Sequence, residues 1–207
     1  MTPSTDTPNR AGNADAFRRL HVPGRPVLIA NAWDAGSARL IESCGGAAIA
    51  TTSAGLAWAR GYPDGDALPP AILAAAVAEI ARVIDVPLSV DAEGGYSDLP
   101  ARVGEVVRAI VDAGGIGINI EDGSSGPDLL VAKIAAARTA AARAGVGLFI
   151  NARTDVYLRS LVEPTLRSTR RSHGRLGTAM PAPTACSFRR PPIPTLSAGS
   201  PPTPACR

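Results

Sequence analysis

Short apolar runs alternate with helical patterns between residues 26 and 153, and this alternation restricts the chain to few folds. The runs expected to form strands are residues 27–31, 47–51, 87–91, 116–120 and 148–152. The segments expected to form helices are residues 35–44 and 69–84, a segment starting at Pro100, and residues 129–144. Strands that are apolar almost throughout and are separated by helices belong to parallel sheets covered on both faces.

This pattern predicts an α/β fold of the TIM-type (β/α)8 barrel class, of which the chain supplies about five βα units. Charged residues recur at the ends of successive strands, as they do in barrels. No GxGxxG motif follows the first strand, so a dinucleotide-binding unit is not indicated. A doubly wound sheet is the alternative that the pattern leaves open.

Charged side chains stand at the carboxyl ends of three predicted strands. Asp91 and Glu93 follow one strand, Glu121 follows the next, and Arg153 follows the last. Asp64 comes from a loop after an earlier strand. Because parallel strands all end at the same face, we expect these groups to meet there. Carboxylates facing one arginine indicate a divalent-metal site beside an anion site.

The net charge of +3 is unevenly distributed along the chain. Residues 165–207 hold seven arginines and no acidic residue. All 18 acidic residues therefore lie before this tail, and that part of the chain is net acidic. An acidic body is expected of a protein that gathers carboxylates around a cation.

Six motifs occur in the order and spacing of one enzyme superfamily. They are NAWDAGSAR (31–39), TTSAGLA (51–57), GYPDG (61–65), VDAEGGY (90–96), INIED (118–122) and NARTD (151–155). Over residues 17–163 the chain resembles the isocitrate lyase / phosphoenolpyruvate mutase superfamily, including 2-methylisocitrate lyase and carboxyphosphonoenolpyruvate phosphonomutase.

The resemblance implies a (β/α)8 barrel that binds Mg²⁺ or Mn²⁺ and a small 2-oxo acid or enolpyruvate-type carboxylate at its carboxyl-terminal face. By position in the motifs, Asp91 would bind the metal directly. Glu93 and Glu121 would act mainly through metal-bound waters, which suits the hydration that Mg²⁺ retains. The implied reaction makes or breaks a C–C or P–C bond beside a carbonyl, through an enolate.

The resemblance also implies roles on the substrate side. Asp64 matches the loop aspartate that orients the site, and Arg153 would pair with the substrate carboxylate and the developing enolate. Thr52, Ser53 and Ala54 match a loop whose backbone N–H groups hold the anionic end of the substrate.

The segment after Glu121-Asp122 departs from the lyases of the superfamily. Those lyases carry a mobile lid with a Lys-Lys/Arg-Cys-Gly-His motif, whose cysteine is a catalytic acid/base. Here residues 123–128 read GSSGPD, without lysine, cysteine or histidine. A mutase, decarboxylase or hydrolase acting on oxaloacetate-like or phosphonate-like substrates therefore fits better than an isocitrate or 2-methylisocitrate lyase.

Residues 164–207 are expected to be a disordered tail outside the family, because they are rich in proline and arginine and lack a sustained apolar period. Reverse translation with G or C at silent positions, read one base upstream, restores a helix–strand–helix pattern. We hypothesise a frameshift near residue 164. The alternative function is then an inactive truncated product, or a non-enzymatic binding protein with a basic tail.

The remaining features set the cellular context that we expect. Residues 1–16 are polar and expected to be disordered. No signal peptide or apolar run of transmembrane length is present, so a cytoplasmic protein without membrane contact is expected. The tail lacks interleaved aromatic residues, so no nucleic-acid partner is expected. The resemblance implies a homo-oligomer that binds a small carboxylate.

Overall fold

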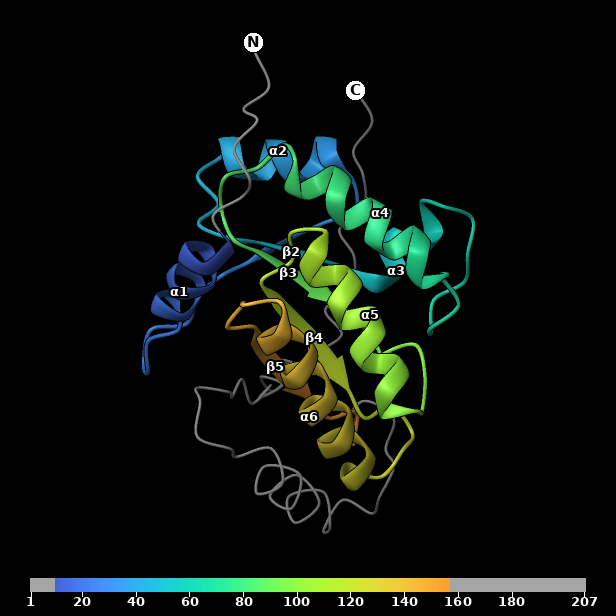
Figure 1. Cartoon of the computed structure of the whole chain (residues 1–207). Coiled ribbons are helices and arrows are strands. Elements are labelled where there is room, and N and C mark those ends of the chain that lie inside the picture. The colour runs from blue at the N-terminus through green and yellow to red at the C-terminus, as the bar shows by residue number, and fades with distance from the viewer. Residues whose placement is uncertain (1–9, 157–207) are drawn as a thin grey trace, which may run out of the picture.

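A computed structural model describes residues 10–156 of the chain (Figure 1). The elements, in chain order, are α1 (Arg10–Leu20), β1 (Ala30–Ala32), α2 (Ala35–Ser43), β2 (Ile49–Thr51), α3 (Ser53–Trp58), α4 (Pro70–Ala81), β3 (Leu88–Asp91), α5 (Pro100–Asp112), β4 (Gly117–Glu121), α6 (Pro127–Arg143) and β5 (Phe149–Arg153). The predicted strands and helices are all present, with ends that shift by a few residues.

The five strands form one parallel sheet in the order β1-β2-β3-β4-β5. Each strand therefore pairs with the strand before it in the sequence. A doubly wound sheet reverses its strand order at a switch point, and this sheet has none. The barrel-type arrangement is confirmed over the described strands, and the doubly wound alternative is wrong.

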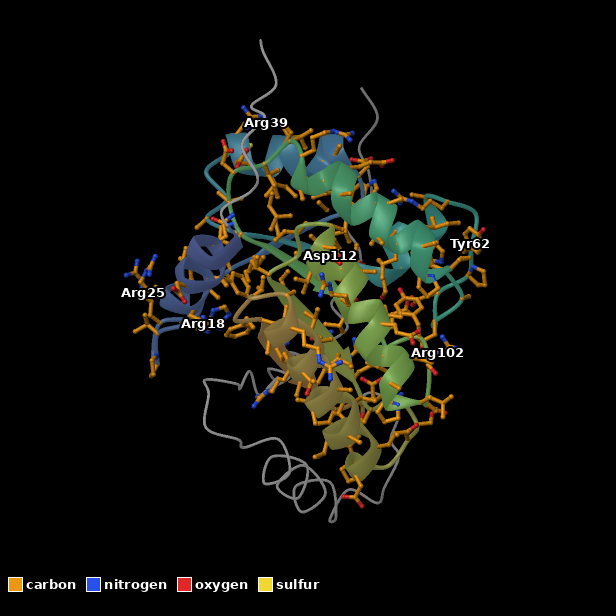
Figure 2. All side chains as sticks on the ribbon, viewed as in Figure 1. Arg18, Arg25, Arg39, Tyr62, Arg102 and Asp112 are labelled. Atoms are coloured by element: carbon orange, nitrogen blue, oxygen red, sulfur yellow. The ribbon has the colours of Figure 1, made fainter. Side chains whose placement is uncertain are left out.

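Helices α2, α4, α5 and α6 pack side by side along one face of the sheet (Figure 1). Their apolar residues meet those of the strands in one core; on β4 the core residues are Ile118 and Ile120, both 0% exposed. Charged residues such as Arg39 and Arg102 project from the outer sides of α2 and α5 (Figure 2). This outer layer of helices is the arrangement of a barrel wall.

Within residues 10–156, the apolar strands predict helices on both faces of the sheet, but on the inner face only α1 packs, against the start of β5. Ser89, Asp91, Asn119 and Asn151 line a cavity of about 670 Å³ on this face. Because strand side chains alternate between faces, β3, β4 and β5 direct these polar residues and Phe149 inward and direct apolar residues to the helices. On the inner face, the polar positions continue along β3, β4 and β5 up to the carboxyl ends of these strands.

Proline and one polar cap mark where the helices begin. Pro70, Pro100 and Pro127 each stand in the first turn of a helix, where no N–H partner is needed. At α2, the Asp34 side chain accepts from the backbone N–H of Ser37. In return, the Ser37 hydroxyl oxygen accepts from the backbone N–H of Asp34. These local signals explain why the helix starts follow from the sequence.

Disorder was expected over residues 1–16, but residues 10–16 belong to helix α1, and residues 1–9 lie outside the described residues. Ala14 and Phe17 are each 1% exposed, and the Phe17 ring lies 5.1 Å from that of Phe149, between centroids. The polar composition did not predict this helix, because the helix is stabilised by packing against Phe149, the first residue of β5.

Several expectations fall on the chain beyond this region. The end of the expected barrel domain at residue 163, the tail of residues 164–207 and the proposed frameshift all lie outside the described residues. Within residues 10–156, no helix combines the length and apolar character needed to cross a membrane.

Candidate active site

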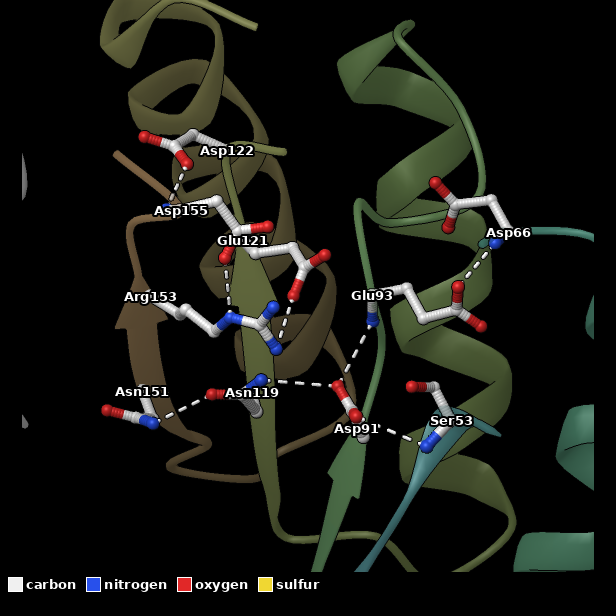
Figure 3. Close-up of polar contacts among 10 residues, drawn as sticks. All are labelled: Ser53, Asp66, Asp91, Glu93, Asn119, Glu121, Asp122, Asn151, Arg153 and Asp155. Carbon is white, nitrogen blue, oxygen red and sulfur yellow. Dashed lines mark hydrogen bonds and ion pairs between the residues drawn. The ribbon is translucent and has the colours of Figure 1, made fainter. Parts of the chain in front are cut away.

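The carboxyl ends of β3, β4 and β5 bring the predicted charged residues together. Asp91, Glu121 and Arg153 are the last residues of these strands. Glu121 is the register partner of Arg153, and Asp91 is that of Asn119 (Figure 3). The alternating pattern puts Glu121 and Asn119 on the same side of β4. A carboxylate cluster and one arginine thus share one edge of the sheet.

Asp91 is held from three sides. The backbone N–H of Ser53, at the start of α3, donates to its Oδ2 at 3.2 Å. The Asn119 amide donates to its Oδ1 at 3.2 Å, and its own N–H donates to the Thr51 hydroxyl at 2.9 Å. These contacts orient one carboxylate from β2, α3 and β4 at once.

A line of amides supports Asp91 from the inner face of the sheet (Figure 3). The Asn151 amide donates to Oδ1 of Asn119 at 2.8 Å, and Asn119 in turn donates to Asp91. Asn151 Oδ1 is buried and has no hydrogen-bond partner among the described residues. Sequence reasoning missed both asparagines, although Asn119 stands two residues before Glu121 on the same face of the strand.

Glu93 turns away from Asp91 toward two loops. It is 5% exposed, and its carboxylate accepts from the backbone N–H of Asp66 and, at 3.0 Å, from the Tyr96 hydroxyl. Burial raises the pKa of Glu93, the two hydrogen bonds oppose this rise, and the negative charges of Asp66 and Asp64 add to it. Asp64 itself is exposed, so it influences Glu93 through its charge.

Three residues of this region have left-handed backbone angles, with φ of 58° at Asp66, 48° at Glu93 and 62° at Tyr96. Such angles are uncommon outside glycine and persist where the surroundings hold them. Here the Tyr96 N–H donates to Asp66 Oδ1 at 3.0 Å, which closes a ring of hydrogen bonds with Glu93. Asp66, two residues after the predicted Asp64, is the loop aspartate that locks the two loops together.

Arg153 is a fixed cation at the end of β5. Its Nη1 lies 2.8 Å from Glu121 Oε2, and its Nε donates to Asp155 Oδ1 at 2.7 Å. Burial lowers the pKa of Arg153, but the Asp155 hydrogen bond and the neighbouring negative charges outweigh it, and the pKa is raised. Within residues 10–156, these contacts use two of the five N–H donors of the guanidinium, which leaves three for an anion.

The predicted anion loop at residues 52–54 is the start of a short helix. Thr52 is the residue before α3, and its side chain makes no capping hydrogen bond. Ser53 and Ala54 lie in the first turn, where backbone N–H groups lack helical partners. The Ser53 N–H is directed to Asp91. The segment therefore adjoins the carboxylate cluster.

The donor set determines which metal the site could hold. Within residues 10–156, no three side chains of the types His, Cys, Asp and Glu are arranged to hold a metal ion. Glu93 is engaged by Asp66 and Tyr96, and Glu121 by Arg153. Mg²⁺ commonly keeps several waters and needs only one or two protein carboxylates. The residues present therefore fit a hydrated Mg²⁺ held through Asp91.

Curated relatives cover the same part of the chain. An uncharacterized protein of Mycobacterium tuberculosis, present in two strains, is 38% identical over 143 residues. That match covers 69% of this chain and 54% of the relative. The chain therefore spans about half the length of the curated relatives it matches.

Solved structures and a family model place the fold in one enzyme group. A Burkholderia cenocepacia protein assigned as a phosphonomutase is 38% identical, with a TM-score of 0.78 over 84% of this chain and 73% of that one. Phosphonopyruvate hydrolase, solved with oxalate and Mg²⁺, is 23% identical and shares the fold, with a TM-score of 0.70 over 81% of this chain and 60% of that one. The family model for phosphoenolpyruvate phosphomutase matches residues 17–174. The chain therefore belongs to the phosphoenolpyruvate phosphomutase family of enzymes, within the superfamily that includes isocitrate lyase.

Proposed function

We propose that the chain is a Mg²⁺-dependent enzyme that makes or breaks a C–C or P–C bond beside the carbonyl of a small 2-oxo acid or enolpyruvate-type carboxylate. The observation that carries this proposal is the meeting of Asp91 with the Glu121–Arg153 ion pair at one edge of the sheet. A carboxylate for a cation and a guanidinium for an anion are the two parts that such a substrate requires.

Arg153 binds the substrate carboxylate in this proposal. A planar guanidinium can give two parallel hydrogen bonds to a carboxylate, and Arg153 is already oriented by Glu121 and Asp155. As the bond beside the carbonyl breaks, its electron pair adds negative charge to the carbonyl oxygen. A fixed cation nearby stabilises that charge without reorganisation.

Asp91 holds the cation in this proposal, while Ser53 and Asn119 keep its carboxylate oriented. Mg²⁺ bound there would supply Lewis-acid polarisation of the 2-oxo group. Glu93, which is tied to Asp66 and Tyr96, contributes negative charge and loop order. Glu121 contributes by holding Arg153.

The segment after Glu121-Asp122, where the lyases of the superfamily carry their lid, favours some reactions over others. Residues 123–126 form a glycine- and serine-rich turn, in which the Ser125 N–H donates to the Asp122 carbonyl at 2.8 Å. This turn has no cysteine to act as the acid/base of the lyases. We therefore favour a mutase, decarboxylase or hydrolase reaction on oxaloacetate-like or phosphonate-like substrates.

The test is an assay of the full chain with oxaloacetate, phosphonopyruvate and 2-methylisocitrate, with Mg²⁺ and with EDTA. We expect turnover of oxaloacetate or phosphonopyruvate that EDTA abolishes. R153K keeps the charge but loses the planar fork, and should lower kcat/KM by about 100-fold. The matched control is R108K, on the outer side of α5 and paired with Asp112, which should have no effect. A folded protein that turns over none of the three substrates would contradict the proposal.

A further inference from the structure

A buried carboxylate beside the site has no part in the reaction described above. Asp122 directly follows Glu121 and is 7% exposed. Its Oδ1 accepts from the backbone N–H of Asp155, and its Oδ2 accepts from the Thr154 hydroxyl, each at 2.8 Å. Both carboxylate oxygens thus accept from residues of the chain that leaves β5, and Figure 3 shows the contact with Asp155.

These contacts connect Asp122 to the guanidinium through one further residue. Asp155 is 0% exposed, and its Oδ1 accepts from Arg153 Nε at 2.7 Å. A carboxylate buried this completely requires partners, and charge-assisted hydrogen bonds are strong and directional. Because Asp122 holds the backbone of Asp155, it determines where the Asp155 carboxylate, and hence Arg153, lies.

Asp122 also holds the turn of residues 123–126, which precedes α6. Its carbonyl accepts from the Ser125 N–H at 2.8 Å, and α6 begins immediately after this turn. The backbone of Asp122 therefore belongs to this turn, while its side chain supports Arg153 through Asp155.

We propose that Asp122 is a positioning residue for the substrate's anionic group, which sets the orientation of Arg153 through Asp155 and links it to the turn of residues 123–126. This inference rests on the proposed function, in which Arg153 binds the substrate carboxylate. Both residues of the Glu121-Asp122 pair then orient Arg153. Glu121 contacts the guanidinium directly, and Asp122 acts through Asp155.

Oxalate binding to the full chain in the presence of Mg²⁺, measured by calorimetry, tests the inference, with binding of Mg²⁺ alone as the second readout. Asparagine at position 122 has one carbonyl oxygen and cannot accept both hydrogen bonds in the same way. D122N should weaken oxalate binding by about 10-fold or more, as loss of outer contacts does at such sites, and leave Mg²⁺ binding unchanged. The matched control, D128N, changes an exposed aspartate in the first turn of α6 and should leave both unchanged.

Two further variants keep the test decisive. T154V removes one of the two bonds to Asp122 at nearly constant volume, and should weaken oxalate binding in the same direction if D122N does not fold. D122N should cause no additional loss in an R153K background, because Asp122 acts through Arg153.

The possible results separate the two proposals. Unchanged oxalate binding in folded D122N, or equal losses for oxalate and Mg²⁺, would overturn the role of Asp122 and leave the proposed function standing. Absence of oxalate binding by the folded wild-type chain would overturn the proposed function itself, and this inference with it.

Discussion

The ammonium group of Lys133 lies 2.8 Å from the carbonyl oxygen of Gly94 and donates a hydrogen bond to it. Lys133 is on α6 and is 5% exposed, whereas Gly94 lies in the loop after Asp91. The same ammonium pairs with Asp98 at 2.9 Å. The only lysine of the chain thus joins a neighbouring helix to the loop that carries Glu93.

Replacing this lysine should destabilise the chain. K133M keeps most of the side-chain volume but leaves the Gly94 carbonyl without its donor. The expected loss is about 1–3 kcal/mol in the free energy of unfolding, measured with urea. The ion pair with Asp98 contributes little to the free energy of unfolding, because the Asp98 side chain is 78% exposed. R143M, on an exposed position of the same helix, is the control, and equal stability of the two variants would contradict the prediction.

Gly94 should not tolerate a methyl group. A Cβ built on it would lie 2.7 Å from Asp66 Oδ2, and Asp66 is held in place by Tyr96 and Glu93. G94A should therefore lower the free energy of unfolding by about 1–3 kcal/mol. Gly126 has no atom within 4 Å of such a Cβ and a φ of −76°, so G126A should be neutral or slightly stabilising. The measurement is urea unfolding. If G94A were as stable as wild type, the loop that holds Asp66 could shift to accommodate the methyl group, and the prediction would be wrong.

Asn119 should influence metal binding without touching the metal. Its amide orients Asp91 Oδ1, so N119A should weaken Mg²⁺ binding by about 10-fold. N31A is the control, because Asn31 lines the same inner cavity from β1 and has no hydrogen bond to Asp91. Calorimetric titration of both variants with Mg²⁺ provides the comparison, and equal affinities would argue against the role of Asn119.

Glu42 should make stability depend on pH. Its carboxylate accepts from the backbone N–H groups of Asp85 at 2.6 Å and Val86 at 3.0 Å. Burial raises the pKa of Glu42, but these bonds and Arg39 outweigh it and hold the pKa below the ordinary value of 4.5. A lowered folded-state pKa means that the stabilisation is full above the ordinary value and is lost as the pH falls through the folded value.

Urea unfolding of E42Q against wild type over a range of pH checks this expectation. The difference in unfolding free energy should be largest at neutral pH and shrink on acidification, because glutamine cannot ionise. E105Q, at an exposed ion pair with Arg102, is the control and should have little effect. A pH-independent difference for E42Q would mean that shape rather than charge matters there.

The frameshift hypothesis makes a prediction about nucleotides. Residues 165–207 lie outside the described part of the structure, so only the gene can test it. One base upstream of the present frame, the DNA should encode further strand and helix patterns of the family. Sequencing across codons 155–207 and beyond decides this. If no such frame exists, the basic, proline-rich tail belongs to the protein and the hypothesis fails.

Local patterns were enough to predict the strands, most of the helices and the residues at the strand ends. Apolar runs identify buried strands, and first-turn prolines mark helix starts. Because parallel strands end at one face, Asp91, Glu121 and Arg153 could be placed together without coordinates. The family resemblance rested on six motifs, three of which contain these residues, and the family match confirms it.

Tertiary structure alone decided what each side chain contacts. The sequence could not show that Glu93 turns to Asp66 and Tyr96, since this depends on left-handed backbone angles that only packed loops maintain. Nor could it reveal helix α1, whose polar sequence becomes helical through the burial of Phe17. The sequence by itself therefore determined the order of elements and the edge where chemistry gathers. The partners of each charge depend on distances between segments far apart in the chain, which no local pattern contains.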